Sequence, residues 1–144
     1  SWKDALRRML PPIDGFQPHT TSPFGAIRDE GTSPHRGVDG NYNVGENGQQ
    51  RINLRHPPLR SPVDGVVTNA GEGAVGRIAI RDVDGVSHEL LHTHRRYVSI
   101  GDRVVAGQMV GTMGNMGVRA DNVERGDHHL HYQVIDPAGR RLNP

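Results

Sequence analysis

Two short histidine motifs carry residue types that bind metal ions. His35 and Asp39 are four positions apart, and His129 and His131 flank Leu130. Alternate residues of an extended segment point to the same face, so each pair is expected to project from one side of its segment. Imidazole nitrogens and carboxylate oxygens suit zinc, and a catalytic zinc site usually has three protein ligands and one open position. His35, Asp39 and His131 could supply such a set, with His129 beside the metal.

Taken alone, each motif also has an ordinary structural interpretation. An HxxxD pair is common, whereas an HxH pair places two imidazoles side by side on a strand, which costs stability unless something binds them. The two motifs occur here in one small chain without cysteine, separated by sequence that favours hairpins. The metal interpretation gains from this combination. No HExxH helix is present, so the common zincin arrangement with a glutamate base is excluded.

Composition excludes several other chemistries. The absence of cysteine rules out disulfides, thiolate zinc sites, iron–sulfur clusters and a cysteine nucleophile. Lys3 is the only lysine, so a P-loop lysine, a Schiff-base lysine and a lipoyl or biotinyl attachment site are absent from the body of the chain. With 17 basic and 16 acidic residues, the chain lacks the net charge that would hold a nucleic acid or a membrane surface. No apolar run approaches the roughly 20 residues of a membrane-spanning helix.

Two glycine-containing patterns point to architecture rather than to a ligand. Gly71–Gly76 matches GxGxxG, but the alternating segment Arg77–Val83 that follows favours a strand, so a glycine-rich β-turn is predicted instead of a dinucleotide site. Ser61–Val67 and Ile100–Gly111 resemble the two halves of a lipoyl or biotinyl carrier domain, without its lysine. A metal-free carrier or sugar-transport-type sandwich domain is therefore one alternative for the whole chain.

The elements expected to position these residues are mostly strands. The length of 144 residues fits one domain, residues 1–144, with room for a core. One helix is expected at Trp2–Leu10, ended by Pro11–Pro12. Arg28–Ser33 and Asn41–Arg60 are polar or rich in glycine and proline and are predicted to be loops. Turn signals recur every 8–12 residues or so, as in all-β folds, and strands or hairpin turns are predicted at Val63–Val67, Arg77–Val83, Asp84–Gly85, His88–His92, Val104–Val110 and Leu130–Ile135.

In order along the chain, the motifs resemble those of the lysostaphin-type (LytM-like) zinc endopeptidases, which cut peptidoglycan cross-links. The resemblance extends from about Ser22 to Pro144 and is specific in combination. It implies an all-β fold, a small antiparallel sheet or barrel-sandwich with one short N-terminal helix and long loops that form a groove. The motifs that carry it are Thr21–Gly25, His35–Asp39 (H-x-G-[IV]-D), Ser61–Val67, Leu90–Thr93, Gly101–Gln108, Gly111–Gly117 and His129–Val134, which is close to H-L-H-[FY]-E-V.

The resemblance also implies roles for individual residues. His35, Asp39 and His131 would bind Zn²⁺. His92 and His129 would be the catalytic histidines that position the water and stabilise the tetrahedral intermediate, and which of them does which remains open. Zinc lowers the pKa of its water and polarises a carbonyl, a neutral histidine can accept and pass on a proton, and an imidazole donor can stabilise an oxyanion.

Other residues near these motifs are expected to have mainly structural or surface roles. Leu90 and Thr93 depart from the family's usual residues and are expected to change packing. His94 would share a face with His92, which leaves open a role in the site or an ordinary surface role, and His128 is interpreted as structural. Surface or singly hydrogen-bonded histidines are expected at His19, His56 and His88.

Two connections look longer than those usual in the family, Asn41–Arg60 and Val118–Asp127. We expect them to form the walls of a substrate groove. Tyr42 and Tyr97 are interpreted as loop tyrosines, with substrate contact as the alternative.

The resemblance leads to one functional hypothesis and one alternative. The chain is expected to be a zinc-dependent endopeptidase that hydrolyses peptide cross-links of bacterial peptidoglycan, as a host enzyme, a phage enzyme or an antibacterial toxin. It would act as a monomer on stem or bridge peptides, in the periplasm or at the cell wall, without nucleic acid or membrane insertion. No secretory signal is visible in its first residues. The alternative is a catalytically inactive LytM-like regulator or wall-binding module.

Overall fold

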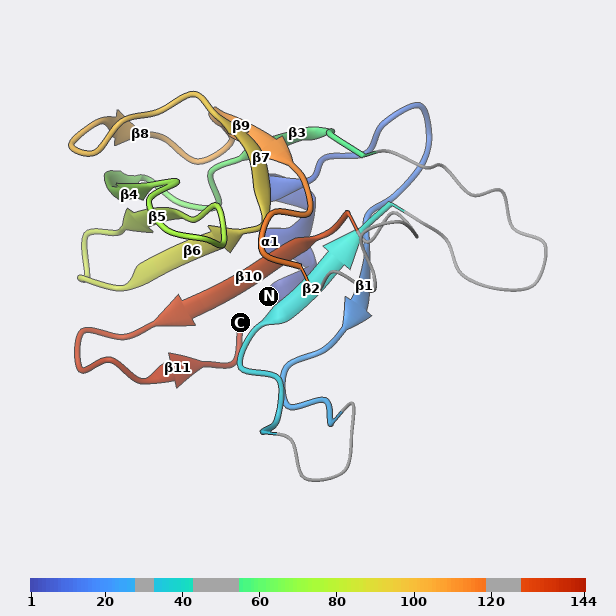
Figure 1. Cartoon of the computed structure of the whole chain (residues 1–144), viewed down its shortest axis with the longest axis horizontal. Helices are drawn as coiled ribbons and strands as arrows, with labels where there is room; N and C mark the ends of the chain where they lie inside the picture. The colour runs from blue at the N-terminus through green and yellow to red at the C-terminus, as the bar shows by residue number, and fades with distance from the viewer. Residues whose placement is uncertain (28–32, 43–54, 119–127) are drawn as a thin grey trace.

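The computed structural model describes residues 1–27, 33–42, 55–118 and 128–144 (Figure 1). Within them the chain forms one helix and eleven strands. The helix, α1, is Trp2–Met9, close to the predicted segment. No helix in these ranges has the length and apolar character needed to span a bilayer. The strands are β1 (His19–Ser22), β2 (Val38–Asn41), β3 (Pro58–Arg60), β4 (Gly65–Ala70), β5 (Ile78–Arg81), β6 (Ser87–Leu91), β7 (Thr93–Arg96), β8 (Arg103–Val104), β9 (Met109–Met113), β10 (Leu130–Ile135) and β11 (Arg141–Leu142).

The strands form two antiparallel sheets. The larger sheet has the order β1-β2-β10-β6-β5-β4-β8, with β11 paired to β10, and the smaller has the order β3-β9-β7. In Figure 1 the smaller sheet lies above β10 and β2. This all-β architecture confirms the predicted fold class. β10 separates β2 from β6 in the sheet, although β2 precedes β6 by more than forty residues in the chain.

The connections between β4, β5 and β6 confirm two turn predictions. Gly71, Gly73 and Gly76 all have positive φ angles, between 57° and 93°, which glycine adopts without steric cost. The GxGxxG segment therefore is a turn that leads into β5 and not the start of a helix. Between β5 and β6, Gly85 has a φ of 79° and the amide of Asp82 donates to the carbonyl of Val86. This is the predicted hairpin.

Helix α1 supports the strands that carry both histidine motifs. In Figure 1 it lies behind β10 and β2. The Trp2 ring stacks on Tyr132 of β10 with centroids 5.6 Å apart, and its indole N–H donates to Thr20 Oγ1 at 2.8 Å. Leu6 is buried against Gly40 of β2, where an added Cβ would lie 2.8 Å from Leu6 Cδ1. The apolar side of this short helix thus packs against β2 and β10 and stabilises them.

Several sequence predictions need correction. The loop predicted at Asn41–Arg60 is too wide, because Asn41 belongs to β2 and its last three residues form β3. The strand predicted at Val104–Val110 is two strands, β8 and β9, with a turn between them in which the Gln108 amide donates to the Val105 carbonyl. Residues 28–32, 43–54 and 119–127, which make up most of the three predicted connections, lie outside the described residues, and so does most of the proposed groove walls.

Tyr42 and Tyr97, both predicted to be loop tyrosines, differ in their exposure to solvent. Tyr42 is not a loop residue on the surface: its side chain is 1% exposed, and its hydroxyl donates to the carbonyl of Pro11. It belongs to the hydrophobic core, so the alternative of substrate contact is lost for it. Tyr97 follows β7 and is 56% exposed, as expected of a loop tyrosine.

Leu90 lies near the middle of the core. It is fully buried on β6, and its register partners are Tyr132 on β10 and Ile78 on β5. We expect Leu90→Ala to lower the free energy of unfolding by about 2–5 kcal/mol, because it leaves a cavity in a packed core. Urea unfolding measures the change. Val83→Ala is the matched control, since Val83 is 97% exposed and should change stability by less than about 0.5 kcal/mol.

Candidate metal centre and active site

Strand pairing brings the two histidine motifs together. β2 and β10 are antiparallel neighbours, and His131 is the direct cross-strand partner of Asp39. Directly opposed residues of such a pair have neighbouring side chains. The structure thus places side by side two residues that are 92 positions apart in the chain.

His35 reaches the same place from outside the strand. β2 begins only at Val38, so Asp39 lies on the strand and His35 lies before it, with a bend at Arg36 and Gly37 between them. Its backbone is held instead by the segment before it: the Gly25 amide donates to the His35 carbonyl at 2.7 Å, and the His35 amide donates to the Ala26 carbonyl at 2.9 Å. These bonds aim the ring at β10.

Three side-chain atoms converge as a result. His35 Nε2 lies 3.2 Å from His131 Nδ1, and Asp39 Oδ1 lies 3.0 Å from His131 Nδ1 and 3.4 Å from His35 Nε2. Within the described residues, this is the only group of at least three histidine, cysteine or acidic residues whose potential ligand atoms all lie within 4.8 Å of one another. The predicted metal-binding residues therefore form one cluster.

The protonation of the rings makes this cluster suitable for a cation. His35 Nδ1 lies 3.1 Å from the carbonyl oxygen of Pro23, which can only accept a hydrogen bond, so Nδ1 carries the hydrogen and Nε2 keeps its lone pair. Asp39 contributes a carboxylate oxygen that is 3.0 Å from the ring of His131. Acceptor atoms this close repel one another unless a proton or a metal ion lies between them. The residues thus fit a divalent cation.

Asp39 is ionised in this environment. Its side chain is buried, which works to raise the pKa of the carboxyl, but the hydrogen bond with His131 and the nearby His129, His131 and His35 outweigh burial and lower the pKa. A buried carboxylate is stable only when it is paired. Asp39 is therefore ready to act as an anionic ligand.

Two further histidines border the cluster. The rings of His92 and His129 have centroids 4.9 Å apart, and the His92 ring is 6.0 Å from that of His131. His92 Nδ1 donates to the backbone carbonyl of Met116 at 2.7 Å, which leaves Nε2 as a proton acceptor. Burial lowers the pKa of His92, so the neutral ring predominates at neutral pH. All five residues predicted from the sequence thus lie in one place.

His92 occupies a strained backbone position. It lies between β6 and β7 and has a φ of 66°, in the left-handed region that few residues other than glycine adopt. Such strain persists where the surrounding structure imposes it, and it is common at active sites. Here the amide of His92 donates to the carbonyl of Val75 at 2.7 Å, and the next residue, Thr93, is fully buried. The turn directs the His92 ring towards His129.

Comparison with known proteins decides the family. Residues 33–144 match the family model described as peptidase family M23. The chain belongs to peptidase family M23. It is 33% identical over 103 residues to the glycyl-glycine endopeptidase ALE-1 of Staphylococcus capitis, an alignment that covers 69% of this chain and 24% of the relative. The chain thus spans about a quarter of the length of this curated relative.

Solved structures agree on the fold. The catalytic domain of the prophage-encoded M23 protein EnpA from Enterococcus faecalis superimposes with a TM-score of 0.68 at 23% identity, over 92% of this chain and 93% of that one. A zinc-containing peptidase from Vibrio cholerae superimposes with a TM-score of 0.69 at 21% identity, over 94% of this chain and 38% of that one. The predicted resemblance and the fold class of this M23 chain are confirmed.

The space around Gly37 explains why the first motif, His35–Asp39, has a glycine at this position. A Cβ at this position would lie 2.6 Å from His131 Nε2 and 2.7 Å from the carbonyl oxygen of Tyr132, closer than real atoms approach. We expect Gly37→Ala to displace the His131 ring and to weaken the binding of a divalent cation by these residues about tenfold or more, as loss of ligand orientation typically does. Competition with a chromophoric chelator measures this affinity, and a circular dichroism spectrum checks the fold. Unchanged affinity would show that the close approach has no role in metal binding.

The remaining histidines lie outside the metal cluster. His56 and His94 stack face to face with centroids 3.7 Å apart, and the His128 ring lies 5.2 Å from that of His56. The structural interpretation of His128 fits its burial, and His94 belongs to this stack and not to the metal cluster. His88 is not a surface residue: it is buried and bonded through both ring nitrogens, to the Tyr132 hydroxyl and to Asp82.

The sequence interpretation missed the residues behind His131. His131 Nε2 lies 2.9 Å from Gln133 Oε1, and Gln133 in turn contacts Glu89 and Arg141. The available signal was the spacing of His131 and Gln133 on one face of a predicted strand. Glu89 could not be found this way, because its contact depends on the register between β6 and β10.

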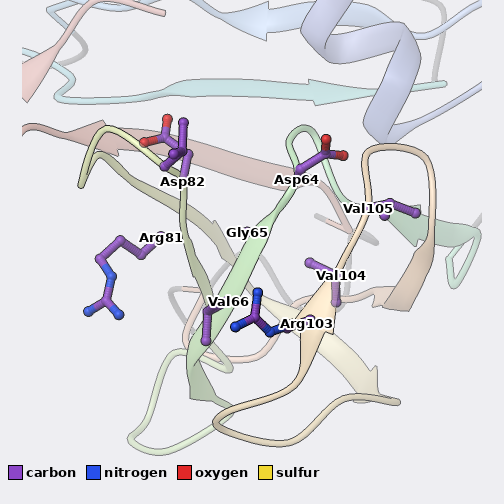
Figure 2. A pocket seen from close by; sticks show the side chains of 9 residues that line it. Asp64, Gly65, Val66, Arg81, Asp82, Arg103, Val104 and Val105 are labelled. Carbon is purple, nitrogen blue, oxygen red and sulfur yellow. The ribbon is translucent and has the colours of Figure 1, made fainter.

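A surface hollow elsewhere is unrelated to this centre. It has a volume of about 500 Å³ and is lined by residues of β4, β5 and β8 and the adjoining turns, among them Arg81 and Arg103 (Figure 2). It is not lined by any of the five residues His35, Asp39, His92, His129 and His131. Its position at the far edge of the larger sheet separates it from β2 and β10.

Proposed function

We propose that this chain is a zinc-dependent endopeptidase that hydrolyses peptide cross-links of bacterial peptidoglycan, at the cell wall or in the periplasm. The observation that carries the proposal is the convergence of His35, Asp39 and His131 within 3.0–3.4 Å, beside His92 and His129. Membership of the M23 family and the likeness to a protein named a glycyl-glycine endopeptidase support the reaction class.

The proposed chemistry assigns ligand roles to three residues. His35 Nε2, Asp39 Oδ1 and His131 Nδ1 would hold the zinc ion. When bound there, zinc supplies Lewis-acid polarisation of the scissile carbonyl and lowers the pKa of water. The likeness to a zinc-containing peptidase of the same fold supports this choice of metal.

His92 and His129 would then move the protons. Water adds to the carbonyl carbon, the C–N bond breaks, and the proton lost by the water ends on the leaving amine. One of the two imidazoles accepts and passes on this proton, and the other donates a hydrogen bond to the developing oxyanion. The Nδ1 hydrogen of His92 is held by the carbonyl of Met116, so Nε2 is the nitrogen that can accept a proton, and this favours His92 as the proton acceptor.

Hydrolysis of purified peptidoglycan tests the proposal. Glycine-bridged walls and walls with direct diaminopimelate cross-links are both incubated with the protein, with a strong chelator, and with chelator followed by added zinc. We expect new amino groups that disappear with chelator and return with zinc, and mass spectrometry of the fragments identifies the bond. Equal release with and without chelator would contradict a zinc enzyme, and wall binding without release of amines would favour a wall-binding module.

A further inference from the structure

Gln133 lies directly behind the metal cluster. It is two residues after His131 on β10, its side chain is 3% exposed, and its Oε1 is 2.9 Å from His131 Nε2. This nitrogen is on the opposite side of the ring from Nδ1, which faces His35 and Asp39. The amide thus contacts the part of the ring that a metal ion would not touch.

The orientation of the Gln133 amide is fixed from both ends. Arg141 donates from its guanidinium to Gln133 Oε1 at 2.7 Å, and Gln133 Nε2 donates to Glu89 Oε1 at 2.8 Å. A guanidinium can only donate hydrogen bonds and a carboxylate can only accept them. The oxygen of the amide must therefore face Arg141 and its nitrogen must face Glu89, so that a flipped amide would lose both bonds.

Fixing the amide also fixes the tautomer of His131. Since Gln133 Oε1 is an acceptor, His131 Nε2 must carry the hydrogen that it receives. When Nδ1 also carries a proton, that proton makes the hydrogen bond to Asp39 Oδ1 at 3.0 Å. When the ring is neutral, its lone pair is on Nδ1 and faces Asp39 Oδ1 and His35 Nε2, which is 3.2 Å away, so that a metal ion can take the place of the proton. The opposite tautomer would turn a hydrogen towards the place where the ligands converge and leave two acceptors facing each other at Nε2.

Glu89 is held in turn by the sheet. It is the cross-strand partner of Gln133 on β6, it is 8% exposed, and Arg77 Nε lies 3.3 Å from its Oε1. Buried carboxylates need such partners. Glu89, which is paired with Arg77, thus accepts a hydrogen bond from the Gln133 amide, and the same amide accepts one from His131 Nε2.

We propose that Gln133, oriented by Glu89 and Arg141, is a positioning residue that holds His131 in the tautomer and ring orientation required of an Nδ1 metal ligand. The inference rests on the proposed function, since it concerns the same metal cluster. Partners of this kind typically change metal affinity 10–100-fold when they are removed. Gln133 touches neither the proposed metal position nor the reacting atoms, so its effect would pass through His131.

A first experiment needs no variant. In metal-free, ¹⁵N-labelled wild-type protein at mildly alkaline pH, long-range ¹H–¹⁵N spectra report which ring nitrogen of each histidine carries hydrogen. We expect His131 Nε2 to carry hydrogen, because Gln133 Oε1 can only accept a hydrogen bond from it. The opposite tautomer, or a rapid mixture of both, would overturn the inference in the folded protein.

A second experiment measures zinc affinity by chelator competition. We expect Gln133→Leu to weaken zinc binding 10–100-fold, and Gln17→Leu, at an exposed position before β1, to leave it unchanged. The exchange of Gln133→Glu together with Glu89→Gln keeps the net charge and an acceptor at His131, so this double variant should recover most of the affinity lost in Gln133→Leu.

The outcomes separate this inference from the proposed function. If the wild type binds no zinc, the proposed ligand set fails and the inference falls with it. If the wild type binds zinc and hydrolyses peptidoglycan but folded Gln133→Leu binds zinc equally well, only the positioning role is lost. If the exchanged pair binds no better than Gln133→Leu, the acceptor at position 133 is not what supports His131.

Discussion

Replacement of His131 by alanine is expected to abolish stoichiometric zinc binding and peptidoglycan hydrolysis together. His131 Nδ1 is the atom that both His35 and Asp39 approach, at 3.2 and 3.0 Å. Without it, two ligands remain where a catalytic zinc site usually has three. Loss of the metal removes several kcal/mol of transition-state stabilisation, so we expect a fall in rate of at least about a thousandfold.

Two measurements on one preparation check this expectation. Elemental analysis after dialysis gives zinc per chain, and release of amino groups from purified walls gives the rate. His19→Ala is a matched control, because His19 is a half-buried histidine of the same sheet that is absent from the metal cluster. It should keep one zinc ion and its activity. A His131→Ala protein that hydrolyses walls at the wild-type rate would exclude His131 from the ligand set.

Local patterns in the sequence predicted the elements that depend on local rules. The bounds of β10 agree with the predicted Leu130–Ile135, and α1 ends within one residue of its predicted end, because alternation and the proline pair act over a few residues. β3 was missed since its three residues become a strand only by pairing with β9. A short edge segment of this kind has no periodicity of its own to detect.

The candidate site likewise combines features that local sequence patterns predict with features that depend on long-range strand pairing. The side-by-side placement of Asp39 and His131 depends on pairing between β2 and β10, which no spacing within either motif can specify. The resemblance to a family supplied that long-range information, and it named His92 together with the other four residues, next to which the structure places its ring. It did not supply the contacts of Gln133 with Glu89 and Arg141, because these depend on the register of two strand pairs in this chain.

His92 should separate catalysis from metal binding. We expect His92→Asn to lower kcat about 10²–10⁴-fold, the usual contribution of a positioned acid or base, while zinc per chain stays at the wild-type value. Asparagine is the chosen replacement because it tolerates the left-handed backbone at this position, where φ is 66°. Alanine there would mix the loss of the imidazole with backbone strain.

The lowered pKa of His92 determines in which direction the rate of hydrolysis changes with pH. Burial lowers the pKa of His92, so the ring loses its proton below the ordinary histidine value and is ready to accept one at neutral pH. A wild-type rate that depends on neutral His92 should therefore fall only when acid protonates it, at a pH below about 6.5. In His92→Asn that group is gone, and the small remaining rate should lose this acidic limb even where zinc is still bound. A variant that keeps both the wild-type rate and the wild-type acidic limb would assign the proton transfer to His129 instead, because its ring is the other imidazole that borders the cluster.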